Sequence, residues 1–296
     1  GRRMSAMRRV GIVYHPALDG AEAVARTLAG VAAERGVEQW VAPLPRDASV
    51  GGLAEAVAGS DLLVCVGGDG TVLHAAGIAA RSETPVYGVR MGRLGFLAES
   101  TEPEGVAGLA TILDGGGRIE QRVMLRAQIE GAEAPPVDAL NDIVIGGEHL
   151  GRTVSVGLRV DGVLIAEYRA DAVIASTATG STGYALATGG PILHPTSQDV
   201  VVAPVAPHLS NTNALVLPPT AQIELLVARG ARVLMIADGA VEQPVEAGAV
   251  VRVELSPLRV RFVRLGEERQ FYARLAQRLG WLRADHALGA DAASQP

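Results

Sequence analysis

The sequence contains no lysine, and all 26 of its basic residues are arginines. Several familiar mechanisms need a lysine ammonium group, among them the GxxxxGK[ST] phosphate loop, the Schiff base and the strand lysine of protein kinases. The sequence excludes all three. Any phosphate site in this chain must therefore draw its positive charge from arginines, backbone N–H groups or a bound cation.

Cysteine, long apolar runs and long basic runs are also nearly absent. Cys65 is the single cysteine, which excludes an intrachain disulfide and a cysteine-rich metal site and favours a cytoplasmic setting. No apolar run is long enough to cross a bilayer, so we expect a soluble protein with no membrane partner. The net charge is −6, with no long basic run beyond the N-terminus, so a nucleic-acid partner is not expected.

The first part of the chain alternates strand-like and helix-like segments. The predicted strands cover residues 9–15, 37–44, 61–66 and 85–90, and the predicted helices cover residues 20–36, 52–59, 71–80 and 103–115. Such alternation predicts a parallel sheet covered by helices. In sheets of this kind ligands collect at the carboxyl ends of the strands.

The pattern changes after the glycines at 115–117. Short period-two segments separated by turns then follow, at residues 122–130, 153–169, 171–176, 221–239 and 249–265. They predict a β-sandwich-like part, with Asp161 and Gly162 as a hairpin turn. We expect an α/β domain at 1–117, an all-β domain at 118–265, a C-terminal helix at 266–286 that docks on the N-terminal domain, and a disordered tail at 287–296.

One loop in the first part carries the clearest chemical signal. Residues 61–77 read DLLVCVGGDGTVLHAAG, which is a strand, a glycine loop and the start of a helix. Glycines let a phosphate reach the backbone, and a helix N-terminus favours an anion. Asp69 is out of place in a pure anion site, but it fits a group that takes a proton from an attacking hydroxyl or helps to hold Mg²⁺. The alternative is that Asp69 merely caps the helix.

The GGDGT motif at 67–71 resembles a phosphoryl-transfer superfamily that contains NAD kinases, diacylglycerol- and sphingosine-type lipid kinases and 6-phosphofructokinases. Three further segments resemble NAD kinases in particular. Residues 169–195 are similar to the family segment DGxxxSTPTGSTAYxxSAGGP, residues 139–145 (ALNDIVI) to its Asn-Glu motif, and residues 92–99 (GRLGFLAE) to its GxLGFL element. The motifs stand in the family order and span most of the chain.

This resemblance implies an enzyme that phosphorylates the 2′-hydroxyl of the adenosine ribose of NAD to give NADP. ATP or polyphosphate would be the donor, with Mg²⁺ or another divalent cation. It implies that Asp69 is the catalytic base. It also implies a homo-oligomer, either a dimer or a tetramer, in which a neighbouring subunit completes each NAD site. The implied nucleotide-binding residues are Gly67, Gly68, Gly70, Thr71, His74, Asn141, Asp142, Arg152, Arg169, Asp171, Thr179, Thr182, Gly183, Tyr184, Ala185, Leu186 and Ala187.

The chemistry of several of these residues suits the implied roles. An amide such as Asn141 offers a donor and an acceptor to an adenine edge, and a carboxylate such as Asp142 accepts from ribose hydroxyls. The guanidinium of Arg169 can make paired bonds to pyrophosphate. Asp171 matches a residue at the nicotinamide end, and Tyr184 offers an aromatic face to a base.

Some assignments have plainer alternatives. His74 also fits a histidine packed on the buried side of a helix, and Arg152 also fits an ordinary exposed arginine. The chain departs from the family pattern at four positions. Asp142 stands where the family has glutamate, Ala178 where it has proline, Gly183 where it has alanine, and Ala240 where it often has an amide side chain.

Two other functions stay open at this point. A lipid kinase of the diacylglycerol type shares the GGDGT motif, and would need an exposed apolar groove or a membrane-facing surface but not the GSTGY segment. A dinucleotide-binding sensor without catalysis is the other alternative. Asp69 argues against the sensor, because binding alone gains nothing from a carboxylate that faces phosphates.

Overall fold

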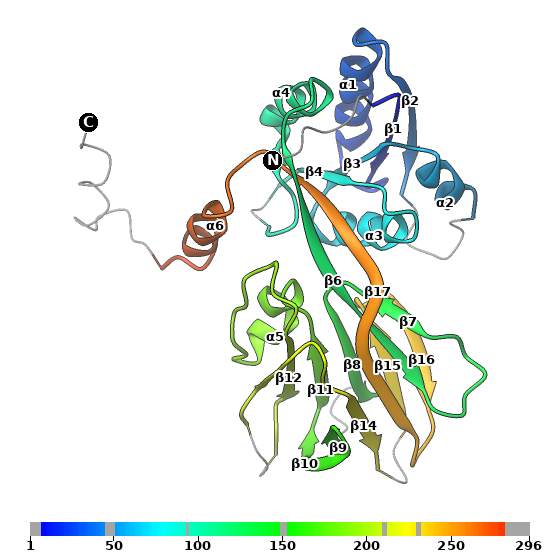
Figure 1. Ribbon diagram of the computed structural model, residues 1–296, viewed down its shortest axis with the longest axis vertical. Helices are drawn as coiled ribbons and strands as arrows, with labels where there is room; N and C mark the ends of the chain where they lie inside the picture. The colour runs from blue at the N-terminus through cyan, green and yellow to red at the C-terminus, as the bar shows by residue number, and fades with distance from the viewer. Residues whose placement is uncertain are drawn as a thin grey trace.

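The computed structural model of the protein describes residues 7–44, 51–92, 95–148, 153–208, 212–228 and 232–281. They form an upper lobe of strands flanked by helices and a lower lobe made mainly of strands (Figure 1). Two long strands, β6 (Arg118–Ile129) and β17 (Val250–Arg264), run from one lobe into the other. The predicted fold class, an α/β part followed by a β-rich part, is confirmed.

The N-terminal lobe alternates strand and helix as predicted. Its elements are β1 (Arg9–Tyr14), α1 (Ala21–Glu34), β2 (Glu38–Pro43), α2 (Gly51–Ala58), β3 (Leu62–Gly67), α3 (Asp69–Ala80), β4 (Val86–Arg90), β5 (Ser100–Thr101) and α4 (Glu102–Leu113). The pairings of β1 with β2 and β3, and of β4 with β3 and β5, are parallel. All six residues of β3 are buried, as expected for a strand covered on both faces.

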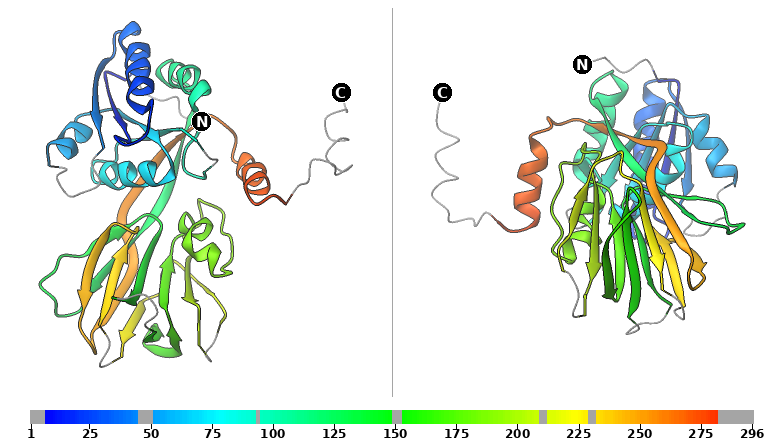
Figure 2. Two further views of the ribbon diagram at one scale, coloured as in Figure 1. Left: turned by 180° about the vertical axis from the view of Figure 1, so that it is seen from behind. Right: turned by 60° about the horizontal axis from the view of Figure 1, so that its bottom comes forward.

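Helices cover both faces of this sheet (Figure 2). Leu62, Val64 and Val66 of β3 pack in the same cluster as residues of α1 and α4. Leu63 and Cys65 point the other way and pack with residues of α2 and α3. The alternation of β3 side chains between two apolar layers explains why its sequence is an unbroken apolar run.

The second lobe holds two sheets packed face to face. Its other elements are β7 (Val137–Ala139), β8 (Asp142–Gly147), β9 (Val154–Val160), β10 (Val163–Ala170), β11 (Ala172–Ser176), η1 (Gly180–Thr182), α5 (Tyr184–Ala187), β12 (Val200–Val205), β13 (Leu215–Leu217), β14 (Ile223–Val227), β15 (Val233–Ala237) and β16 (Val241–Val245). One core joins Val156 and Leu225 of the first sheet to Ile143 and Met235 of the second. The hairpin turn between β9 and β10 is confirmed, since φ is positive at both of its central residues.

The first sheet is continuous through both lobes, which the sequence pattern did not reveal. Its strands run in the order β10-β9-β14-β17-β4-β3-β1-β2. Strand β17 pairs antiparallel with β6 along both lobes and parallel with β4 at Phe262 and Val86. The register of β6 and β17 shifts between Leu255 and Arg259, around Pro257, which is a position where a proline is tolerated in a strand. The glycines at 115–117 therefore mark a change of pattern but no break in the sheet.

The C-terminal helix α6 (Gln270–Arg278) follows β17. Leu275 is its buried residue, and the aromatic ring of Phe271 meets that of His194 edge to face at 5.3 Å. Arg274 donates to the backbone oxygens of Ala98 and Glu99 in the N-terminal lobe. The tail predicted at 287–296 and the last residues of the predicted helix, 282–286, lie outside the described residues. No helix in the described part of the chain is long and apolar enough to cross a membrane.

Candidate active site

Asp69 stands at the carboxyl end of the buried strand β3, as the first residue of α3. Its Oδ2 accepts the N–H of Phe96 at 2.6 Å and its Oδ1 accepts the N–H of Leu97 at 3.2 Å. The N-cap of α3 is Gly68, so the interpretation of Asp69 as a mere helix cap is wrong. The side chain is 30% exposed, which leaves the carboxylate both oriented and accessible.

A glycine makes this arrangement possible on one side of the carboxylate, and two open glycines flank Asp69 in the chain. A Cβ at Gly95 would lie 1.9 Å from Asp69 Oδ1 and 2.3 Å from Oδ2, so only glycine lets the backbone come this close. At Gly68 and Gly70 there is no atom within 4 Å of the place that a Cβ would occupy. The glycine loop therefore exposes its backbone, as the sequence predicts for a phosphate site.

A cavity of about 200 Å³ opens beside Asp69. It lies between segments of both lobes and the C-terminal helix. Its lining residues are Asp69, Gly70, Leu73, Phe96, Leu97, Asn141, Thr179, Thr182, Gly183 and Arg278. The carboxylate of Asp69 thus faces a space that also contains an amide, hydroxyl groups and a guanidinium group.

The loop after β11 is pressed onto the start of β8. Thr177 Oγ1 donates to the backbone oxygen of Leu140 at 2.6 Å, and the N–H of Thr177 donates to that of Asn141 at 2.9 Å. A Cβ at Gly180 would lie 2.2 Å from the oxygen of Asn141, so the contact needs a glycine. These bonds bring the side chain of Asn141 and the hydroxyls of the following threonines to one cavity.

Asp238 fixes the backbone of Asn141 and Asp142. Its carboxylate accepts the N–H groups of Leu140 (2.8 Å), Asn141 (2.7 Å) and Asp142 (3.2 Å). Asp142 is buried beside it, and burial together with the negative charge of Asp238 raises the pKa of Asp142 to about 7. Burial also raises the pKa of Asp238, although its three N–H bonds act in the opposite direction. Near neutral pH, Asp142 therefore exchanges between a donor and an acceptor form.

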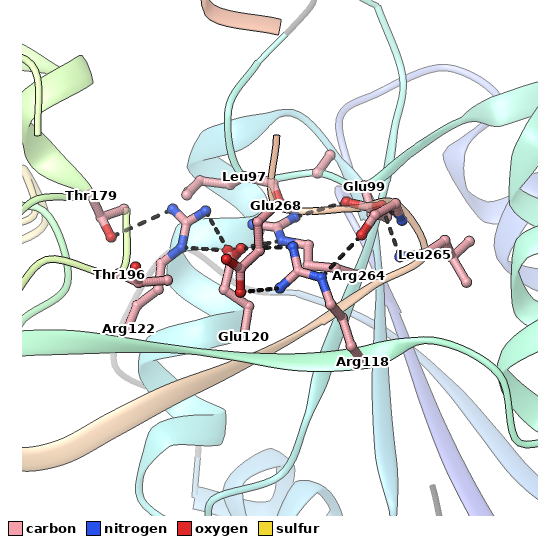
Figure 3. A network of polar contacts seen from close by, with 12 residues as sticks. Leu97, Glu99, Arg118, Glu120, Arg122, Thr179, Thr196, Arg264, Leu265 and Glu268 are labelled. Carbon is pink, nitrogen blue, oxygen red and sulfur yellow. Dashed lines mark hydrogen bonds and ion pairs between the residues drawn. The ribbon is translucent and has the colours of Figure 1, made fainter. Parts of the chain in front are cut away.

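A buried network of arginines and glutamates contacts two residues that line the cavity, Thr179 and Leu97 (Figure 3). Glu120 accepts from Arg122 at 2.8 and 3.0 Å and from Arg264 at 3.1 Å. Although burial raises the pKa of Glu120, the charges of Arg264 and Arg122 lower it to about 2. Arg122 reaches Thr179 Oγ1 at 3.5 Å, and Arg264 donates to the backbone oxygen of Leu97 at 2.8 Å. The network therefore connects the loop after β11 (residues 177–182, the threonine loop) to the segment that orients Asp69.

Comparisons with known proteins decide the family. A family model described as the ATP-NAD kinase N-terminal domain matches residues 17–116, and one described as the ATP-NAD kinase C-terminal domain matches residues 140–265. The NAD kinases of Chloroflexus aurantiacus and Dehalococcoides mccartyi are 38% and 32% identical to this chain over 277 residues. These alignments cover 92% of this chain, and 99% and 96% of the relatives. The chain belongs to the NAD kinase family.

Solved structures agree with this result. The NAD kinase of Archaeoglobus fulgidus in complex with ATP has a TM-score of 0.75 and 25% identity, and the likeness covers 90% of this chain and 98% of that one. Yeast NADH kinase complexed with NADH has a TM-score of 0.80 at 21% identity over 96% of this chain and 90% of that one, a likeness of fold. The enzyme has NAD kinase activity, the ATP-dependent phosphorylation of NAD to NADP. This decides against the lipid kinase and the non-catalytic sensor.

The structure brings about half of the expected NAD kinase site together. Gly70, Asn141, Thr179, Thr182 and Gly183 line the cavity with Asp69. Others lie directly behind it: Gly67 ends β3, Gly68 precedes α3, Thr71 is buried in the first turn of α3 and Asp142 is buried next to Asn141. His74 is half-buried on α3, and burial lowers its pKa, but it is not one of the lining residues.

The remaining expected residues do not meet at this cavity in the single chain. In α5, Ala185 is fully buried, Leu186 is half-buried, and Tyr184 (46% exposed) and Ala187 are exposed. Arg169 and Asp171 lie at the opposite end of β11 from the threonine loop, about 17 Å away by the rise of a strand. Asp171 Oδ1 is 3.4 Å from His208 Nε2. Arg152 lies outside the described residues.

Sequence reasoning missed several residues of the site. Phe96 and Leu97 orient Asp69 and Gly95 makes room for it, yet the GxLGFL segment was noted only for its resemblance. Its unusual density of glycines was a usable signal. Arg278 lines the cavity from α6, and no local pattern connects it with Asp69.

The residues present fit a divalent cation that is shared with phosphates. Among the described residues there is no group of three or more His, Cys, Asp or Glu that could hold a metal ion. Asp69 is the one carboxylate among the residues that line the cavity. Mg²⁺ is commonly bound by one or two carboxylates together with substrate phosphates, which matches this donor set. Bound beside Asp69 and held mainly by the phosphates, the cation would neutralise phosphate charge.

Proposed function

We propose that Asp69 is the general base of the phosphoryl transfer. The 2′-oxygen of the adenosine ribose of NAD forms a bond to the γ-phosphorus of ATP, and its proton passes to the Asp69 carboxylate. The bond between the γ-phosphorus and the β,γ-bridging oxygen breaks, and its electrons leave with ADP. The observation that carries this proposal is the pose of Asp69, which is held by the N–H groups of Phe96 and Leu97 while it faces the cavity.

The orientation of the carboxylate is the main contribution of the fold. A positioned general base contributes a factor of roughly 10²–10⁴ to the rate. Phosphoryl transfer needs little covalent chemistry from the protein, so positioning and compensation of charge make up most of the remainder. Two backbone N–H bonds fix Asp69, and the backbone of Leu97, which supplies one of them, is itself held by Arg264.

We propose that the donor phosphates lie against the glycine loop. Gly68 and Gly70 have open space in place of a side chain, and they flank the N-terminus of the twelve-residue helix α3. The backbone there can approach phosphate oxygens closely, and the helix dipole favours negative charge. ATP and polyphosphate both present such phosphates. With no lysine available, the reaction requires Mg²⁺ or another divalent cation.

We propose that NAD binds along Asn141, Asp142 and the threonine loop. Asn141 and Thr182 line the same cavity as Asp69, so an adenosine held there can present its ribose to the base. Asp142 is buried at the start of β8, where its shorter side chain replaces the usual glutamate. A carboxyl with a pKa near 7 can donate to or accept from a ribose hydroxyl, depending on pH.

We further propose a homo-oligomer, a dimer or tetramer, in which Arg169 and Asp171 serve the NAD site of a neighbouring copy. Both residues lie away from the cavity of their own chain. Strand β10, which carries Arg169, is an edge strand of the sheet and exposes Val163 (62%) and Leu164 (51%). An apolar exposed edge favours pairing with another chain. The proposal includes a cytoplasmic setting, which the single, fully buried thiol of Cys65 supports.

One assay tests the proposal directly. Purified protein is incubated with NAD, Mg²⁺ and either ATP or polyphosphate, and NADP is detected with an NADP-specific dehydrogenase. We expect NADP with ATP and none in excess chelator, with recovery on addition of Mg²⁺. Product that forms undiminished in chelator would refute the cation requirement. Light scattering under the same conditions tests the oligomer, and full activity of a monomer would refute it.

A further inference from the structure

Helix α6 is fixed against the segment that orients Asp69. Arg274 donates to Glu99 Oε2 and to the backbone oxygen of Glu99, both at 3.1 Å. Glu99, whose side chain is 4% exposed, also accepts the N–H groups of Leu265 (2.9 Å) and Gly266 (3.1 Å) at the end of β17. Leu275 is buried beside these contacts. The position of α6 is thus set by Arg274 and Leu275.

Arg278 lies one helical turn after Arg274, on the same face of α6. Its Nη1 is 3.7 Å from Asp69 Oδ2, and its guanidinium carbon is 4.4 Å from the centre of the Phe96 ring. The aromatic face orients the planar guanidinium group, and the side chain remains 36% exposed. Arg278 is therefore held at the cavity by Phe96, whose own N–H orients Asp69.

The charges in the cavity indicate what Arg278 can do at this position. Among the described residues that line it, Asp69 is the one anion and Arg278 the one cation. A donor triphosphate would bring several negative charges next to Asp69, and repulsion between partly buried anions is costly. The chain has no lysine to offset it. A guanidinium group within contact distance of the Asp69 carboxylate and of the donor phosphate can offset this repulsion.

We infer that Arg278 is a second catalytic residue, whose guanidinium group binds the transferred phosphoryl group. The inference rests on the function proposed above and adds a residue to it. As the phosphate enters, Arg278 turns its N–H groups from Asp69 to the phosphoryl oxygens, and Asp69 is left to accept the proton of the 2′-hydroxyl. Arg278 itself gains and loses no proton or electron pair. It stabilises the charge on the oxygens as one bond to phosphorus forms and the other breaks.

If Arg278 had a purely structural role, its loss would disturb the docking of α6. Its 3.7 Å separation from Asp69 exceeds hydrogen-bond length, whereas Arg274 makes close bonds to Glu99. The helix therefore has an anchor that does not involve Arg278. Loss of Arg278 should leave the docking contacts of Arg274 and Leu275 in place while it removes the positive charge at the cavity.

The test compares R278Q and R278K with the wild type in steady-state kinetics for ATP and NAD. The control is R269Q at the N-cap of the same helix, because Arg269 is 83% exposed and pairs with Glu267. We expect kcat of R278Q to fall by about 10³-fold, the lower end for arginines that contact a transferred phosphoryl group. KM for NAD should stay within about threefold, and R269Q should match the wild type. R278K keeps a point charge but not the planar fork, and should fall by about tenfold.

Added guanidinium ion at low concentration should partly restore turnover to R278Q, an effect that a structural role does not predict. A kcat of R278Q within threefold of the wild type, or a rise in KM for ATP at unchanged kcat, would overturn the inference. If R278Q does not fold, R278K decides: wild-type turnover there would overturn the inference, because the planar guanidinium group would then contribute nothing to the reaction. Wild-type turnover of D69N would instead refute the proposed function of Asp69, on which the inference rests.

Discussion

The substitution G95A should disable the enzyme without disturbing its fold. The added Cβ would lie 1.9 Å from Asp69 Oδ1, and ordinary contact begins near 3.4 Å, so the carboxylate must move by about 1.5 Å. That movement breaks its bonds to the N–H groups of Phe96 and Leu97. A misplacement of about 1 Å costs roughly 10²-fold in rate. Since φ of Gly95 is not positive, alanine suits the backbone, and the conflict is with Asp69 alone.

We expect kcat of G95A to fall by about 10²-fold or more, with a melting temperature within a few degrees of the wild type. The assay is coupled detection of NADP, with NAD affinity measured separately by calorimetry. The matched control is G77A on α3, where a Cβ meets no atom within 4 Å and alanine favours the helix by about 0.5–1 kcal/mol. If G95A turns over at the wild-type rate, the pose of Asp69 does not govern catalysis.

Three further substitutions test other parts of the argument. D69N keeps the shape but removes the base, so turnover should fall by roughly 10²–10⁴-fold while NAD affinity measured by calorimetry stays; normal turnover would contradict the role. Because the folded-state pKa of Asp142 is raised to about 7, its protonated form stabilises the fold below pH 4, and that stability is lost as pH rises to about 7. D142N should thus show a smaller decrease in melting temperature between pH 5 and 8 than the wild type, and an equal decrease would contradict this. E120Q leaves Arg122 and Arg264 without their shared anion, and should lower the free energy of unfolding in urea by about 3–5 kcal/mol; a loss below 1 kcal/mol would show that the network relaxes.

Local patterns predicted the elements well because their causes are local. The glycine loop, the helix that begins beside Asp69 and the hairpin turn at Asp161 each depend on neighbouring residues. The family motifs likewise identified Asn141 and Thr179, which line the cavity.

The parts that the sequence did not reveal depend on contacts between distant segments. Asp69 meets Phe96 across 27 positions, and Arg278 lies 209 positions after Asp69. Neither contact leaves a periodic trace in the chain. Asp238 holds the backbone of Asn141 across 97 positions. Periodicity reports which face of an element is buried, but not which other element covers it.

The ribbon formed by β6 and β17 has a consequence for how the molecule melts. Met124 and Phe262 complete the apolar interior next to α3, while Leu125 and Val253 complete the one between the two sheets of the other lobe. Each of these two hydrophobic cores therefore contains residues of both β6 and β17. A fragment that stops at residue 117 would lack both strands, so the apolar residues of β3 and α3 that pack with Met124 and Phe262 would be exposed to water. Heating should produce a single calorimetric peak for the whole enzyme.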